Sequence, residues 1–93
     1  MTTHAIAMIT VTNPEAMGAY REKAGAALAK HGGTVLQASK ELIALEGESA
    51  LPSLIAVLSF PDQTSALAWR NDPKLIDVHA SRNDAGTSNI ILM

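Results

Sequence analysis

The sequence predicts an α+β fold in which an antiparallel sheet of four strands carries its helices on one face. Three observations lead to this expectation. The 93 residues suffice for one small domain, residues 1–93. The apolar patterns follow each other in the order strand, helix, strand, strand, helix, strand. Two of the strand patterns are apolar on both faces, so both faces of the sheet need a cover.

The first strand is expected over residues 3–12. One face carries His4, Ile6 and Met8, and the other carries Ala5, Ala7, Ile9 and Val11. A helix should follow, because Asn13 suits the N-cap, Pro14 the first helical position and Glu15 the positive end of the helix dipole. It is expected to run to about His31. Its buried stripe is predicted to contain Met17, Tyr20, Ala24, Ala27, Leu28 and His31.

The middle of the chain predicts two further strands. Residues 34–46 look extended, with an irregularity at Ser39-Lys40, and residues 47–52 look like a turn. Residues 53–60 give the clearest alternation. Leu54, Ala56, Leu58 and Phe60 face one way, and Ser53, Ile55, Val57 and Ser59 face the other.

Two helical segments and a strand are expected in the remainder. Asp62 can cap a helix that runs to about Asn71, and Asp72-Pro73 repeats the capping signal for a third segment to about residue 83. Residues 84–86 should form a turn into a last strand over residues 87–92. This order of elements is the ferredoxin-like, split βαβ pattern.

The helix-free face of such a sheet predicts a homodimer. Its apolar residues would form a larger exposed patch than monomers usually carry. Alanine supplies 16 of the 93 residues and only three are aromatic, so one chain has a thin core of small side chains. A second copy packed sheet against sheet would cover the patch.

Composition excludes several classes of function. The net charge of -2, without a basic cluster, speaks against nucleic-acid binding. There is no cysteine, which excludes disulfides and thiolate metal sites. The N-terminal apolar run is a poor signal peptide and too short to span a membrane, so a cytoplasmic location without membrane association is expected. His4, His31 and His79 lack metal-ligand spacing, so no metal site is expected. Without a phosphate loop or dinucleotide fingerprint, no cofactor is expected either.

Several short motifs resemble those of a small bacterial family, domain of unknown function 1330 (DUF1330). They are Asn13-Pro14-Glu15 with Tyr20, Ala29 to Gly33, Glu46-Gly47, Phe60-Pro61, Ala66 to Trp69 and Asp72-Pro73. The resemblance covers nearly the whole chain in order. It implies a ferredoxin-like chain that forms a dimeric α/β barrel. It implies no reaction, because the family has no agreed activity.

The sequence departs from this family at three places. Glu48-Ser49-Ala50 stands where members usually carry an aromatic residue, Arg70 where they carry tyrosine, and Lys74-Leu75 where they tend to have Glu-Tyr. Each difference removes an aromatic side chain from the neighbourhood of the expected cleft.

The segment His31-Gly32-Gly33 can be a helix end or a ligand-facing corner. A glycine with positive φ after the last turn explains it as architecture, and at least one of the two glycines is predicted to have that conformation. His31 would still bring a titratable ring to the end of the helix, where the dipole favours its protonated form.

Trp69, His79 and Arg82 form the second candidate group. His79 and Arg82 are three residues apart on one helical face, with the tryptophan nearby. Together with His31, they are the predicted lining of a cleft for a small ligand with a carboxylate. The alternative is an amphipathic helix edge beside a core tryptophan.

Three functions therefore stay open. The first is a small-ligand-binding homodimer. The second is a cofactor-independent enzyme resembling small monooxygenases or isomerases, an analogy at the level of fold. The third is a purely structural or regulatory dimer.

Overall fold

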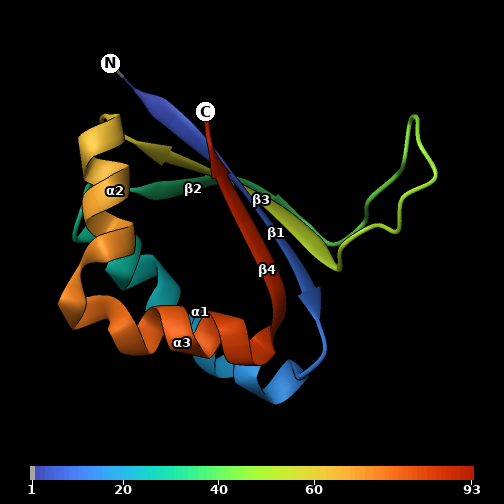
Figure 1. The fold of residues 1–93 in the computed structure, drawn as a ribbon, viewed down its shortest axis with the longest axis horizontal. Coiled ribbons are helices and arrows are strands. Elements are labelled where there is room, and N and C mark those ends of the chain that lie inside the picture. Colours follow the sequence, from blue (N-terminus) through green and yellow to red (C-terminus); the bar gives the residue numbers. More distant parts are fainter. Residues whose placement is uncertain (1) are drawn as a thin grey trace.

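The computed structural model describes residues 2–93 and confirms the ferredoxin-like arrangement (Figure 1). The elements follow in the order β1 (Thr3–Val11), α1 (Pro14–Ala29), β2 (Thr34–Ser39), β3 (Leu54–Phe60), α2 (Gln63–Asn71), the 3-10 turn η1 (Pro73–Leu75), α3 (Ile76–Ala85) and β4 (Gly86–Leu92). The strands form one antiparallel sheet in the order β2-β3-β1-β4.

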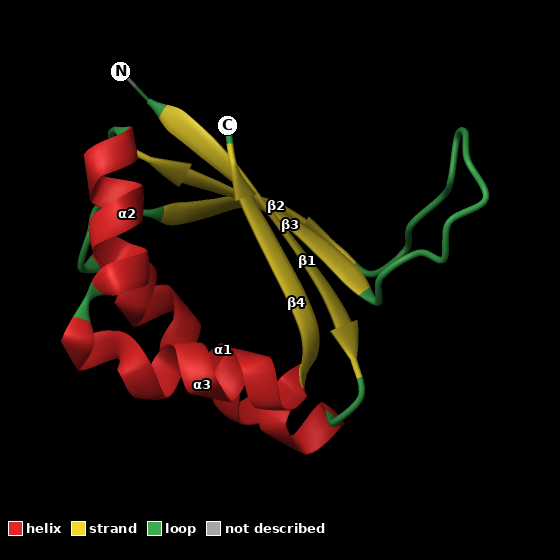
Figure 2. Cartoon of the chain, viewed as in Figure 1, coloured by secondary structure: helices red, strands yellow, loops and turns green. Residues whose placement is uncertain are grey.

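The helices cover one face of this sheet (Figure 2). Helices α1 and α3 pack side by side, and α2 lies against β3. The core lies between the two layers, and the alternation expected in the strands supplies its sheet side. Its sheet side consists of Ala5, Ala7 and Ile9 from β1 and Leu54, Leu58 and Phe60 from β3. Small side chains in β1 leave room between the layers.

The opposite face of the sheet has no helix over it (Figure 2). The registers of β1 with β3 and β4 place Ile6 beside Val57 and Ile91, and Met8 beside Ile55. We call these five residues the outer apolar face. Among residues 2–93, nothing packs over it as the helices do over the other face.

The end of α1 confirms the capping prediction. Gly32 has φ 72°, and the N–H groups of Gly32 and Gly33 donate to the carbonyls of Ala29 and Leu28, at 3.1 and 2.8 Å. This pair of bonds is the Schellman pattern that closes a helix around a left-handed residue. The chain then leads directly into β2, so His31-Gly32-Gly33 forms a helix end.

The segment between β2 and β3 differs from the expectation. The strand predicted over residues 34–46 ends at Ser39, and its irregularity lies between Val35 and Gln37 rather than at Ser39-Lys40. Residues 40–53 form a projecting arm (Figure 1). The alternating residues 42–46 find no strand partner, because β3 begins only at Leu54. Alternation alone therefore overestimated β2.

Helix α3 also runs further than expected. The turn predicted at residues 84–86 is wrong, because α3 continues to Ala85 and β4 begins at Gly86. The Ala85 carbonyl accepts the N–H groups of Thr12 and Asn13 at 2.9 and 3.0 Å. Gly86 has φ 155°, and a Cβ there would collide with the Thr10 backbone. The chain therefore passes from α3 to β4 at Gly86, without a separate turn between them.

No helix within residues 2–93 has both the length and the apolar character needed to cross a membrane.

Candidate functional site

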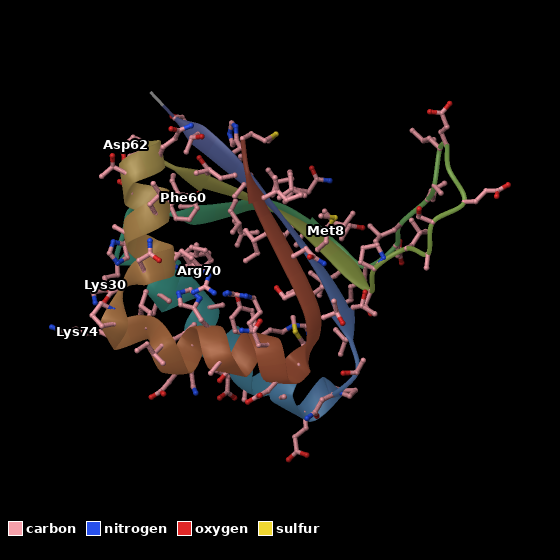
Figure 3. The ribbon with its side chains drawn as sticks, in the orientation of Figure 1. Met8, Lys30, Phe60, Asp62, Arg70 and Lys74 are labelled. Atoms are coloured by element: carbon pink, nitrogen blue, oxygen red, sulfur yellow. The ribbon has the colours of Figure 1, made fainter. Side chains whose placement is uncertain are left out.

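Asp72 joins the end of α1 to the junction between α2 and η1. Its Oδ2 lies 2.6 Å from Nζ of Lys30 and 2.9 Å from Nε2 of His31. Its Oδ1 accepts the backbone N–H of Lys74 at 2.8 Å, which caps η1. Figure 3 shows Lys30 and Lys74 at this corner of the molecule. His31 is therefore paired with a carboxylate, which gives it a structural role.

The same contacts lower the pKa of Asp72 well below its usual value. Hydrogen bonds from Lys30, then from His31, and then from the Lys74 backbone stabilise the ionised carboxylate, and they outweigh the cost of burial. We call Asp72, Lys30 and His31 the Asp72 junction. Its carboxylate has a partner at each oxygen.

A second cluster lies deeper, between α1, α2 and α3. The Arg82 guanidinium carbon lies 5.4 Å from the ring centre of Trp69 and 5.7 Å from that of Tyr20. The ring of His79 meets that of Trp69 edge to face, at 4.8 Å between centres. The aromatic faces attract the guanidinium charge. We call Arg82, Trp69, His79 and Tyr20 the Arg82 cluster.

The surroundings of His79 disfavour its charged form, and the tautomer of the ring follows from its partner. Its Nε2 donates to the Trp69 carbonyl at 3.0 Å, because a carbonyl can only accept. Burial lowers its pKa most, and the neighbouring positive charges of Arg82 and Arg70 lower it further. His79 thus supports the backbone at Trp69, and its neutral form adds no charge next to Arg82.

The polar atoms of this cluster are buried and largely unpaired. Arg82 is only 2% exposed and Trp69 3%. Within residues 2–93, no acceptor lies within hydrogen-bond distance of Nε or Nη1 of Arg82 or of Nε1 of Trp69, and Nδ1 of His79 has no donor. A buried charge normally has a hydrogen-bonded partner, because removing it from water is costly. The described residues therefore leave these donors without the partners that buried polar groups normally have.

A cavity of about 430 Å³ opens beside these donors. It lies between α2, α3 and the strands β1, β3 and β4. Its lining comprises Ala5, Phe60, Ala66, Leu67, Trp69, Arg70, Arg82, Asn83, Ser88, Asn89, Ile90 and Leu92. We call it the Arg82 cavity. Its size and mixed lining are typical of small-molecule sites.

The structure divides the four site residues that the sequence predicts. Trp69, His79 and Arg82 lie together, and Trp69 and Arg82 line the cavity. His31 is instead bound to Asp72 and lines none of the four cavities described.

Sequence reasoning missed Arg70 as a cavity residue. It lines the Arg82 cavity from the end of α2, and Figure 3 shows it in the space between helices and sheet. The signal that could have identified it is the arginine at position 70, where members of the family usually carry tyrosine. An exposed cation next to a buried one gives the cavity a positive mouth, which favours anions.

The described residues give no support for a metal-binding site. Within residues 2–93, no three side chains of histidine, cysteine, aspartate or glutamate converge. The two histidines that come near the sites each bind a protein oxygen.

Solved structures share this fold at low sequence identity. A protein of unknown function from Rhodopseudomonas palustris, RPA0582, superposes with a TM-score of 0.75 at 17% identity, covering 99% of this chain and 80% of that one. SnoaB, a cofactor-independent oxygenase from Streptomyces nogalater, gives 0.72 at 14%, covering 99% and 90%.

A third similar structure is that of a dimeric ferredoxin-like protein of unknown function from Jannaschia sp. CCS1. It gives a TM-score of 0.69 at 14% identity, covering 100% of this chain and 98% of that one. At such identities the likeness shows the fold alone. No curated protein matches the sequence.

The family-level comparison is more specific. The model of the family described as "Domain of unknown function (DUF1330)" matches residues 2–93, which is nearly the whole chain and includes both the Asp72 junction and the Arg82 cluster. The chain therefore belongs to the DUF1330 family.

Proposed function

We propose that this protein is a homodimer that binds a small carboxylate-bearing molecule in the Arg82 cavity. The observation that carries the proposal is the buried guanidinium whose Nε and Nη1 have no acceptor among residues 2–93. A carboxylate has two oxygens that accept strong, charge-assisted hydrogen bonds from such a group. Trp69 lines the same cavity, and its indole N–H also has no acceptor among residues 2–93.

Calorimetric titration with butyrate and benzoate tests the ligand class. We expect both to bind, and Arg82→Met to weaken binding by about tenfold to a hundredfold, since a hydrogen bond to a charged group contributes about 1.5–3 kcal/mol. Arg21→Met is the matched control, because Arg21 is exposed on α1 and lies outside the Arg82 cavity. Equal weakening by both variants, or no binding by the parent protein, would contradict the proposal.

The homodimer rests on the outer apolar face. Ile6, Met8, Ile55, Val57 and Ile91 form a continuous apolar area across three strands. The dimeric Jannaschia protein supports a homodimer. The usual tendency of proteins to bury apolar areas supports the use of this face. An interface of more than about 1,000 Å² in total is expected. Sedimentation at micromolar concentration tests it, with Val57→Asp expected to give monomers; a monomeric parent protein would refute it.

A second candidate function is a cofactor-independent enzyme. The likeness to the oxygenase SnoaB favours it, together with a cavity that contains a tryptophan beside unpaired donors. Without a cofactor, oxygen must react with an electron-rich substrate that the protein holds and deprotonates. Oxygen uptake with a panel of electron-rich phenols separates this function from binding alone.

A further inference from the structure

A second cavity lies in the same gap between helices and sheet, on the side of β2. It measures about 590 Å³ and is mostly apolar. Met17, Tyr20, Ala24 and Leu28 of α1 form its roof, and its floor is made by Ala7, Ile9, Ala38, Leu54, Ala56 and Leu58 of the sheet. Four of these ten residues are alanines, and their small side chains leave the space between α1 and the sheet unfilled. We call it the apolar cavity.

Both cavities border the Arg82 cluster. Ile90 of β4 lines both of them. Tyr20 lines the apolar cavity and lies against the Arg82 guanidinium, whose other aromatic neighbour, Trp69, lines the Arg82 cavity. The buried charge therefore stands at the boundary of an apolar chamber. A single molecule can reach both if it has a polar head and an apolar body.

The charges at the apolar cavity's rim are a weaker site for the head. Arg21, Lys40 and Glu41 line that rim, and all three are exposed. Water already solvates these groups, and Glu41 repels an anion, so a carboxylate gains little there. At Arg82 the donors are buried and unpaired, so the gain from each hydrogen bond is larger.

We propose that the two cavities form one site for an amphipathic monocarboxylic acid with a straight aliphatic chain. The carboxylate lies at Arg82 and Trp69, and the chain passes Ile90 and Tyr20 into the apolar cavity. This inference rests on the proposed function, because it assumes the carboxylate position. It adds that the part of the ligand beyond the carboxylate is an aliphatic chain.

Calorimetry with acetate, butyrate, hexanoate and octanoate tests the inference. We expect the affinity to rise by about fourfold for each methylene added, the gain for burying one such group. Ala24→Phe places a ring in the apolar cavity that obstructs the path of the chain, and it should remove this dependence on chain length while butyrate still binds. Ala26→Phe is the matched control, because Ala26 is exposed on the same helix and lines neither cavity. Ala38→Phe, on the edge strand β2, places a ring in the same cavity if Ala24→Phe does not fold.

The outcomes separate this inference from the proposed function. Affinity that is lost in Arg82→Met but does not depend on chain length would overturn the inference and leave carboxylate binding intact. Chain-length dependence that persists in both obstructed variants would also overturn it. If Arg21→Met weakens the binding of the longer acids and Arg82→Met does not, the proposed position of the carboxylate is wrong. Failure of every acid to bind would refute both proposals.

Discussion

The Asp72 junction joins the end of α1 to η1, the Arg82 cluster lies between α1, α2 and α3, and the two differ in how their charges are paired. Asp72 has a donor at each carboxylate oxygen, and its contacts join α1 to η1. Arg82 is buried among aromatic rings, and no acceptor within residues 2–93 meets its Nε or Nη1. A satisfied charge stabilises the fold, whereas an unsatisfied buried charge is a cost that ligand binding can recover. The difference gives the Asp72 junction a structural role and supports the binding role that we propose for the Arg82 cluster.

Removing the unpaired charge tests this comparison most strongly. Arg82→Met keeps a side chain of similar length and removes buried donors without partners, so we expect the free energy of unfolding to rise by about 1–3 kcal/mol without ligand. Urea denaturation measures it. Asp72→Asn should do the opposite and lower stability, because it weakens the bonds to Lys30 and His31. A less stable Arg82→Met would mean that the guanidinium supports the fold.

Gly32→Val tests whether the end of α1 belongs only to the structural region. The left-handed conformation at φ 72° costs a β-branched residue about 1–2 kcal/mol. The new Cβ would also lie 2.8 Å from Cγ of Pro61. We expect a lower denaturation midpoint with unchanged affinity for butyrate. Loss of affinity in the folded variant would join the two regions functionally.

The pH dependence of stability should separate the regions into two windows. The pKa of His79 is lowered from 6.5 in the folded state, so below that pH the unfolded chain binds a proton that the folded chain does not, and stability falls. The pKa of Asp72 is lowered from 3.8, so its contribution is present above 3.8 and is lost as the pH falls further. Thermal denaturation from pH 7 downward, with His79→Gln and Asp72→Asn, assigns each window.

The smallest effect is expected from Gly25→Ala. A Cβ at this position within α1 meets nothing within 4 Å. Replacing a helical glycine by alanine should stabilise the protein by about 0.5–1 kcal/mol without altering either region. The variant is therefore a helix-stability control for Gly32→Val, and a loss of stability would show that α1 is strained at a second place.

Local signals in the sequence predicted the capped helix starts and the end of α1, but not the end of α3. Asn13, Asp62 and Asp72 each accept a backbone N–H at a helix start, and Gly32 closes α1. These signals act over three or four residues, so they can be read without the fold. The length of β2 depended on a partner strand that the sequence does not show, and alternation in residues 42–46 gave a false strand.

The candidate site could be predicted only in part for a related reason. Helical spacing placed His79 and Arg82 on one face with Trp69 nearby, and in the structure these three residues lie together. The pairing of His31 with Asp72 joins residues 41 positions apart. Whether a buried arginine has a carboxylate partner depends on such distant contacts, so the unpaired donors were invisible in the sequence.

The strand order β2-β3-β1-β4 has a consequence for how the chain reaches this state. Every neighbouring pair of strands joins one from before the arm to one from after it. Neither half of the chain contains a hydrogen-bonded pair of strands of its own. A nascent chain therefore cannot form any part of the sheet until β3 leaves the ribosome, and the ladder that places Thr10 beside Thr87 must wait for the last strand. Such distant pairings make folding slow relative to helical proteins of equal length.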